Sequence, residues 1–128
     1  MNNLSQQILE IAEIPDQARE LTQAVIQVVD MLDLYQAELA RILHLQCSDI
    51  GRLANAQSVL EKGTTSWNCA IEFIQLYQLM YQRLQADGVA MRHWLRRHHE
   101  EFNQTPHLML VDEGRLSELV HYLKISTE

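Results

Sequence analysis

The sequence predicts an all-α fold, on the basis of its periodicity and its composition. Apolar residues recur at helical spacing, and no segment shows the sustained apolar–polar alternation of a half-buried strand. The 128 residues are 47% hydrophobic and 21% charged, as in an ordinary globular protein. We expect about seven or eight helices. The clearest helical face combines Leu21, Val25, Val28, Val29 and Leu32.

Two helices are expected in the first quarter of the chain. A short amphipathic segment runs from about Leu4 to Ile14. Pro15 then suits the first turn of a longer helix, where its missing N–H is not needed. Asp16 and Glu20 would lie near the positive end of that helix.

The longest helix is expected from about Ser66 to Ala86, with apolar residues on two sides. One side includes Trp67 and Tyr77, and the other includes Phe73 and Met80. A helix apolar on two sides lies either at the centre of a core or between subunits. Residues 62–66 before it combine a glycine stop with a new N-cap at Ser66, so we predict a boundary between domains 1–65 and 66–128.

Three shorter helices are expected after this one. Asp87 and Gly88 interrupt the long helix. Thr105 is expected to cap a helix that has Pro106 in its first position, and Asp112 to cap the last helix. The apolar faces of the first and last of these three are Met91, Trp94, Leu95 and His98, and Leu116, Leu119, Val120 and Leu123.

Residues 36–53 carry the most informative pattern of the first domain. Two short helices that meet at a steep angle need a small residue at their contact, where Ala40 stands, and apolar inner faces. Leu39, Leu43, Leu45, Ile50 and Leu53 supply those faces. This spacing resembles the helix-turn-helix of phage-repressor-like (Xre-type) regulators, in which the second helix lies in the major groove.

The resemblance implies a role for five residues toward operator DNA. Cys47, Ser48 and Arg52 would face base edges, and Gln36 and Arg41 would approach phosphates. Arg52 has the strongest physical rationale, since its planar fork can bond guanine O6 and N7 together.

Several residues depart from that family's pattern. His44 stands at the turn position usually held by glycine, and Tyr35 stands where a Ser or Thr cap is usual, so Asp33 would have to help. Gly51 weakens the second helix, and Asp49 would repel phosphate. Two interpretations remain open: DNA binding is retained, or the motif survives as a dimerisation scaffold.

Residues 91–123 carry a second ordered signature. Trp94-Leu95 is followed by Thr105-Pro106, an acidic-Gly step at residues 112–114 and an amphipathic last helix. This order resembles the toxin-binding domain of the Xre/MbcA/ParS antitoxins, although His107 and Met109 interrupt its Thr-Pro-Leu element. The combined resemblance implies a type II antitoxin that neutralises a RES-type, NAD-degrading toxin and autoregulates its operon through DNA binding.

The apolar residues of this signature are expected in the core, so toxin contacts are assigned to polar or amphipathic neighbours. Arg and Tyr are favoured as interface anchors. We assign toxin binding to Arg115, Glu118, Tyr122 and Lys124. A homodimer is expected from the doubly apolar long helix and from the palindromic operators of helix-turn-helix proteins.

Charge restricts how this chain binds DNA. The net charge is −7, and residues 1–34 carry six acidic residues against one arginine. Most of the surface would repel phosphate, so DNA binding would depend on a local patch.

Two alternative functions remain. The chain could be a stand-alone helix-turn-helix regulator without a toxin, or a scaffold that has lost DNA binding.

Catalysis, metals and membranes are not expected. No GxSxG, Walker-type loop, GxGxxG or HExxH motif occurs, so we predict no enzyme activity. Residues 92–99 contain His93, His98 and His99 at spacings that do not form a ligand set, so no metal or cofactor is expected. That stretch is either a solvated basic face or a patch for an acidic partner or DNA.

The remaining features predict a cytoplasmic protein. Cys47 and Cys69 form no CxxC pair and are expected as reduced thiols. The longest apolar run is four residues, from Leu108 to Val111, which is too short to cross a membrane. The N-terminus lacks the basic and apolar regions of a signal peptide.

Overall fold

A computed structural model describes residues 8–126, which form seven helices and no strand within that range. The prediction of an all-α fold is confirmed. The helices are α1 (Ala18–Met31), α2 (Gln36–Leu43), α3 (Cys47–Ala54), α4 (Thr65–Arg83), α5 (Gly88–Arg96), α6 (Pro106–Val111) and α7 (Leu116–Ile125).

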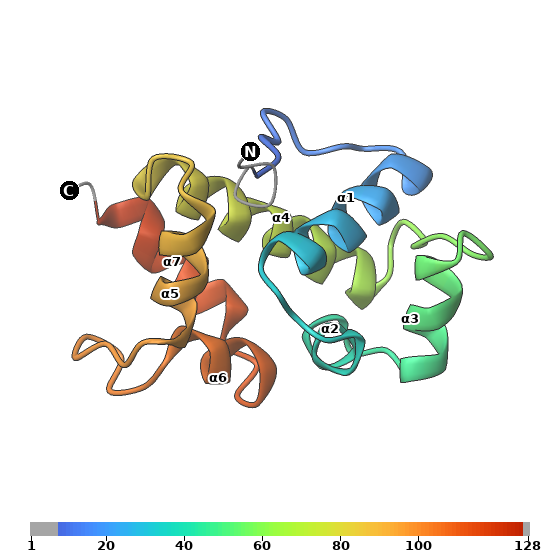
Figure 1. Ribbon diagram of the computed structural model, residues 1–128. Coiled ribbons are helices and arrows are strands. Elements are labelled where there is room, and N and C mark those ends of the chain that lie inside the picture. The colour runs from blue at the N-terminus through green and yellow to red at the C-terminus, as the bar shows by residue number, and fades with distance from the viewer. Residues whose placement is uncertain (1–7, 127–128) are drawn as a thin grey trace.

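Helix α4 is the central element of the fold. Its 19 residues give it a length of about 28 Å. Helices α1–α3 gather around one end and α5–α7 around the other, with α4 running between them (Figure 1). Helix α4 contacts α1 and α2 in the first group, and α5 and α7 in the second. One continuous apolar core therefore joins the two groups.

Both apolar sides of α4 are buried inside this one chain. Trp67 and Tyr77 of the first predicted side and Phe73 and Met80 of the second are all buried. Of the two interpretations of such a helix, the central position in the core is therefore the observed one. The expectation of a homodimer loses the support it drew from this helix.

The segment before α1 differs from the prediction. Residues 8–14 are not helical, and residues 4–7 lie outside the described range. Carbonyl groups of this segment accept hydrogen bonds from side chains of α4 instead of from N–H groups within the segment. Tyr77 donates its hydroxyl to the Leu9 carbonyl, and the Gln78 amide donates to the Ile11 carbonyl at 2.8 Å. The predicted helix was wrong because apolar residues three apart, Ile8 and Ile11, contact the core without helical hydrogen bonds.

Three predicted helix starts also need correction. Helix α1 begins at Ala18, after Pro15 and not around it. Helix α4 is capped by Thr64, whose hydroxyl accepts from the Trp67 N–H at 3.1 Å. Ser66, the predicted cap, instead donates to the Leu43 carbonyl at the end of α2. Arg115 occupies the N-cap position of α7 in place of Asp112.

The predicted start of α6 is confirmed. Thr105 caps it by accepting from the Leu108 N–H at 3.2 Å, and Pro106 stands at its first position. Helix α5 ends at Arg96, so His98 is exposed, and it is His99 that is buried. None of the helices between residues 8 and 126 has the length and hydropathy of a bilayer-spanning segment.

Candidate functional site

Helices α2 and α3 form a compact unit joined by a short turn. The backbone of His44 is left-handed, with φ 61° and ψ 44°, and the next N–H, of Leu45, bonds the Ala40 carbonyl at 2.9 Å. This closes α2 in the way that a glycine usually does, at a cost of order 1 kcal/mol for a residue with a side chain. The buried residues Leu39, Leu43 and Ile50 then hold the unit against the core.

Both helices begin with a carboxylate that accepts a hydrogen bond from the N–H of the N-cap residue. Glu38 accepts a hydrogen bond from the Tyr35 N–H at 2.9 Å, and Asp49 accepts one from the Gln46 N–H at 3.0 Å. A carboxylate three residues into a helix satisfies a free N–H there and favours the positive end of the dipole. The help that was expected from Asp33 is not observed, since α2 has Glu38 on the Tyr35 N–H and no side-chain cap bond. Asp49 has a structural reason to stand in α3.

The structure brings three of the five predicted DNA contacts together on α3. Cys47, Ser48 and Arg52 are all exposed, and at 100° per residue they fall within an arc of about 140°. Gln36 and Arg41 are exposed at the two ends of α2. The described residues thus present the polar face of α3 to solvent, with α2 beside it.

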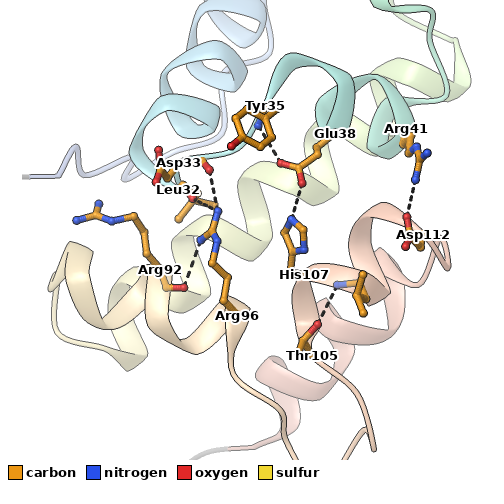
Figure 2. Close-up of polar contacts among 11 residues, drawn as sticks. Leu32, Asp33, Tyr35, Glu38, Arg41, Arg92, Arg96, Thr105, His107 and Asp112 are labelled. Carbon is orange, nitrogen blue, oxygen red and sulfur yellow. Dashed lines mark hydrogen bonds and ion pairs between the residues drawn. The ribbon is translucent and has the colours of Figure 1, made fainter.

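Each arginine of this unit is paired with a carboxylate. Arg52 bonds Asp49 on its own helix. Arg41 bonds Asp112, which follows α6, as Figure 2 shows. The side chains of Arg41 and Arg52 are 64% and 51% exposed. Exposed ion pairs contribute about 0–1 kcal/mol, so either guanidinium can exchange its carboxylate for an anionic ligand at little cost.

The predicted toxin-binding residues begin with a network at the start of α7. The Arg115 guanidinium donates to both Glu118 carboxylate oxygens, at 2.8 and 2.7 Å, and to Glu113 at 2.8 Å. These hydrogen bonds from Arg115 lower the pKa of both carboxyls and raise that of the guanidinium. Arg115 is therefore committed to its own chain and presents little free charge.

Tyr122 is also engaged within the chain. Its hydroxyl donates to Glu101 at 2.9 Å, and its ring meets the edge of Phe102 with centroids 4.8 Å apart. The hydrogen bond to Glu101, followed by burial, raises the pKa of the Tyr122 hydroxyl. Glu118 and Tyr122 share one helical stripe, whereas Lys124 lies off it and is exposed. The four predicted residues thus do not form one surface.

The contacts between the two helix groups were missed by the sequence reasoning. The Arg92 guanidinium donates to the Met31 carbonyl at 2.9 Å. The Arg96 guanidinium donates to the Leu32 and Asp33 carbonyls at 3.0 and 2.7 Å, as Figure 2 shows. These carbonyls lie at the C-terminal end of α1, where positive charge is favourable. A pair of arginines four residues apart on α5 was the available signal, since both then point from one helical face.

His107 forms a further contact between the groups. Its Nε2 lies 2.7 Å from a Glu38 carboxylate oxygen, and both side chains are largely buried. His107 is one of the two residues that interrupt the Thr-Pro-Leu element. The other, Met109, is fully buried. Both departures from the family pattern therefore have a packing role in this chain.

The histidines of residues 92–99 do not converge. His99 is buried, and its Nε2 donates to the Trp94 carbonyl at 2.9 Å, while His93 and His98 are exposed. Within residues 8–126 no three His, Cys, Asp or Glu side chains lie close enough to hold a metal ion.

The chain was also compared with known proteins. No protein-family model matches it, and no curated protein matches it significantly.

Proposed function

We propose that this chain is an antitoxin that binds operator DNA through α2 and α3 and binds a RES-type toxin through its C-terminal helices. The observation that carries the proposal is the exposed polar face of α3. Cys47, Ser48 and Arg52 lie together there, on a helix that is held by an ordered turn and a buried inner face. The Xre-type resemblance of residues 36–53 assigns this face to the major groove.

The charges around α3 favour recognition of particular DNA bases over tight binding to DNA of any sequence. Three acidic residues balance three basic ones between positions 35 and 65, so attraction to the phosphate backbone is weak. Arg52 is exposed, and only the surface pair with Asp49 competes for it. Discrimination between sequences therefore depends on a few direct contacts to bases, with Arg52 the main one.

The DNA half of the proposal is tested with DNA from immediately upstream of the chain's own reading frame. Arg52→Ala is expected to weaken binding by about 5- to 150-fold if Arg52 bonds a guanine. Arg97→Ala, at the end of α5, is the matched control, because it removes the same charge from an exposed position in the other helix group. Equal losses in the two variants would contradict base reading by Arg52.

The toxin half of the proposal rests on the outer face of α7. Arg115 and Tyr122 serve internal contacts, so a change there alters the fold as well as the surface. Lys124 and Ile125 are exposed at the end of α7, and Ile125 is an apolar residue that is 62% exposed. An exposed apolar residue beside a lysine is a suitable contact for a partner.

The toxin experiment co-expresses this chain with the product of the neighbouring reading frame. The variant Lys124→Glu with Ile125→Ser is expected to lose both co-purification of the toxin and protection of the cells. The control pair, Arg19→Glu with Val89→Ser, makes the same kinds of change at exposed positions elsewhere. Full protection by the first pair, at matched expression, would contradict binding at the end of α7.

A stand-alone DNA-binding regulator is the second candidate function. It is favoured by the internal engagement of Arg115 with Glu113 and Glu118, and of Tyr122 with Glu101. In that case the C-terminal helices complete the core of a repressor and bind no toxin. Operator binding together with the absence of any toxin in the co-expression experiment would favour this candidate.

A further inference from the structure

The turn between α6 and α7 faces the end of α2 and the turn that follows it. A shallow hollow separates them, lined on one side by Arg41 and His44 and on the other by Asp112 and Gly114. The pair of Arg41 and Asp112 crosses this hollow and joins positions 71 residues apart in the sequence. A carboxylate from the C-terminal helices therefore stands beside a residue that is assigned to DNA phosphate.

The two acidic residues of this turn have different partners. Glu113 accepts from Arg115 and from the Gln104 amide, so its charge is already compensated. Asp112 instead directs its carboxylate at Arg41 (Figure 2). A phosphate that reaches Arg41 lies close to this carboxylate, where the two negative charges repel each other.

We propose that Asp112 is an electrostatic guard on Arg41, through which the C-terminal helices lower the affinity of α2 for nucleic-acid phosphate. The inference rests on the proposed DNA binding of α2 and α3 and adds its regulation. The guard is weak because both side chains are exposed, Asp112 to 47%. It therefore tunes affinity and salt dependence without blocking the surface.

The test is the variant Asp112→Asn, which removes the charge and keeps the shape. Helix α6 is closed by the backbone N–H of Asp112, which bonds the Leu108 carbonyl at 2.9 Å, so the amide preserves the turn. We expect binding to tighten about fourfold at low salt, the scale of one exposed charge–charge contact. Removing the carboxylate beside Arg41 should also steepen the slope of log affinity against log salt, by at most about 0.9, the value for one complete phosphate contact.

The probes are the upstream DNA and a mixed-sequence duplex of equal length, each titrated by fluorescence anisotropy over a range of salt. Because Asp112 acts on phosphate and not on bases, Asp112→Asn should raise the affinity for both duplexes by the same factor. Arg41→Ala should weaken binding, and Asp112→Asn added to Arg41→Ala should restore nothing. The control Glu13→Gln removes one carboxylate from an exposed position in the segment before α1 and should leave binding unchanged.

Each other outcome overturns the guard. A gain that persists in the Arg41→Ala background, or that Glu13→Gln reproduces, would be a general effect of net charge. A gain on one duplex alone would be an effect on base reading. Wild-type binding that Asp112→Asn leaves unchanged would overturn the guard and leave the proposed function standing. If neither the wild type nor any variant binds either duplex, both the proposed DNA binding and the proposed role of Asp112 are contradicted.

Discussion

Arginines play opposite roles in the two helix groups of this protein. In α2 and α3, Arg41 and Arg52 are exposed and pair with single carboxylates. In α5, Arg92 and Arg96 donate to carbonyl groups at the C-terminal end of α1. The first two are held loosely and are available to an anionic ligand. The second two join the groups of helices together.

This difference shows that formal charge in a sequence does not locate a binding patch. Residues 92–99 are the most basic stretch of the chain, yet two of their three arginines satisfy backbone carbonyls. Residues 36–53 have no net charge, yet each of their two arginines is exposed and bonds only one side-chain carboxylate. Whether an arginine is free for a ligand depends on acceptors that are distant in sequence, because a guanidinium carries five donors that a helix end can occupy.

The comparison predicts that the largest loss of stability comes from α5. Replacing both Arg92 and Arg96 by Ala should lower the free energy of unfolding by about 2–4 kcal/mol, because charge-assisted hydrogen bonds to otherwise unpaired carbonyls are lost. Urea denaturation followed by circular dichroism measures this. The matched double variant, Arg41→Ala with Arg52→Ala, should lose about 1 kcal/mol or less. Equal losses of unfolding free energy in the two double variants would contradict the distinction between arginines that join the helix groups and arginines that are held loosely.

Alkaline pH separates the contribution of arginines from that of a buried tyrosine. Arginines stay charged there and keep their hydrogen bonds, whereas the tyrosine hydroxyl loses its proton. Burial, followed by its neighbour Tyr81, raises the pKa of Tyr77 to about 12. Since the unfolded chain ionises near pH 10, this contribution is complete below pH 10 and is lost as the pH rises through 12. We expect a loss on the order of 1–2 kcal/mol over that range.

Absorbance at 295 nm as a function of pH measures this titration directly. Two of the four tyrosines, Tyr77 and Tyr122, should ionise with a delay, and Tyr77→Phe should remove the phase near pH 12 and flatten stability between pH 10 and 12. Early ionisation of all four tyrosines in the folded protein would contradict the burial of Tyr77.

The contact between Glu38 and His107 should have an intermediate effect, since it joins the two groups through a single bond. A double-mutant cycle with Glu38→Gln and His107→Asn should give a coupling energy of about 0.5–1.5 kcal/mol. Glu38→Gln keeps an oxygen that can still accept from the Tyr35 N–H, so helix α2 remains capped. Strict additivity of the two changes would mean that the contact contributes nothing.

The smallest effect is expected at the surface of α7. Glu118→Gln leaves Arg115 bonded to Glu113, and its change in unfolding free energy should lie within about 0.5 kcal/mol. The same urea experiment serves as the measurement. A loss as large as that of the α5 double variant would show that this surface carboxylate stabilises the fold as much as the carbonyl contacts of Arg92 and Arg96 do.

The local parts of this fold were predictable from the sequence. The pattern of residues 36–53 gives both short helices, and Thr105-Pro106 gives the start of α6, because caps and apolar spacing act within a few residues. The left-handed backbone at His44 was also expected from its position in the turn.

The contacts between distant segments were not predictable in this way. Asp112 was assigned to a helix cap, but its carboxylate meets Arg41. The segment before α1 was assigned to a helix, but the side chains of α4 bind its carbonyls. In both cases the partner is more than 60 residues away, where neither capping nor periodicity carries information. The candidate DNA contacts on α3 lie near one another because they belong to one helix.

Arg52→Lys tests the central claim, that α3 reads DNA sequence, most directly. Lysine keeps the charge but cannot bond guanine O6 and N7 with a planar fork. The measurement is the ratio of affinities for the upstream DNA and for a mixed-sequence duplex at one salt concentration. We predict that Arg52→Lys reduces this ratio by at least about fivefold while affinity for the mixed-sequence duplex is unchanged. An unchanged ratio, or an equal loss on both duplexes, would contradict sequence reading by Arg52.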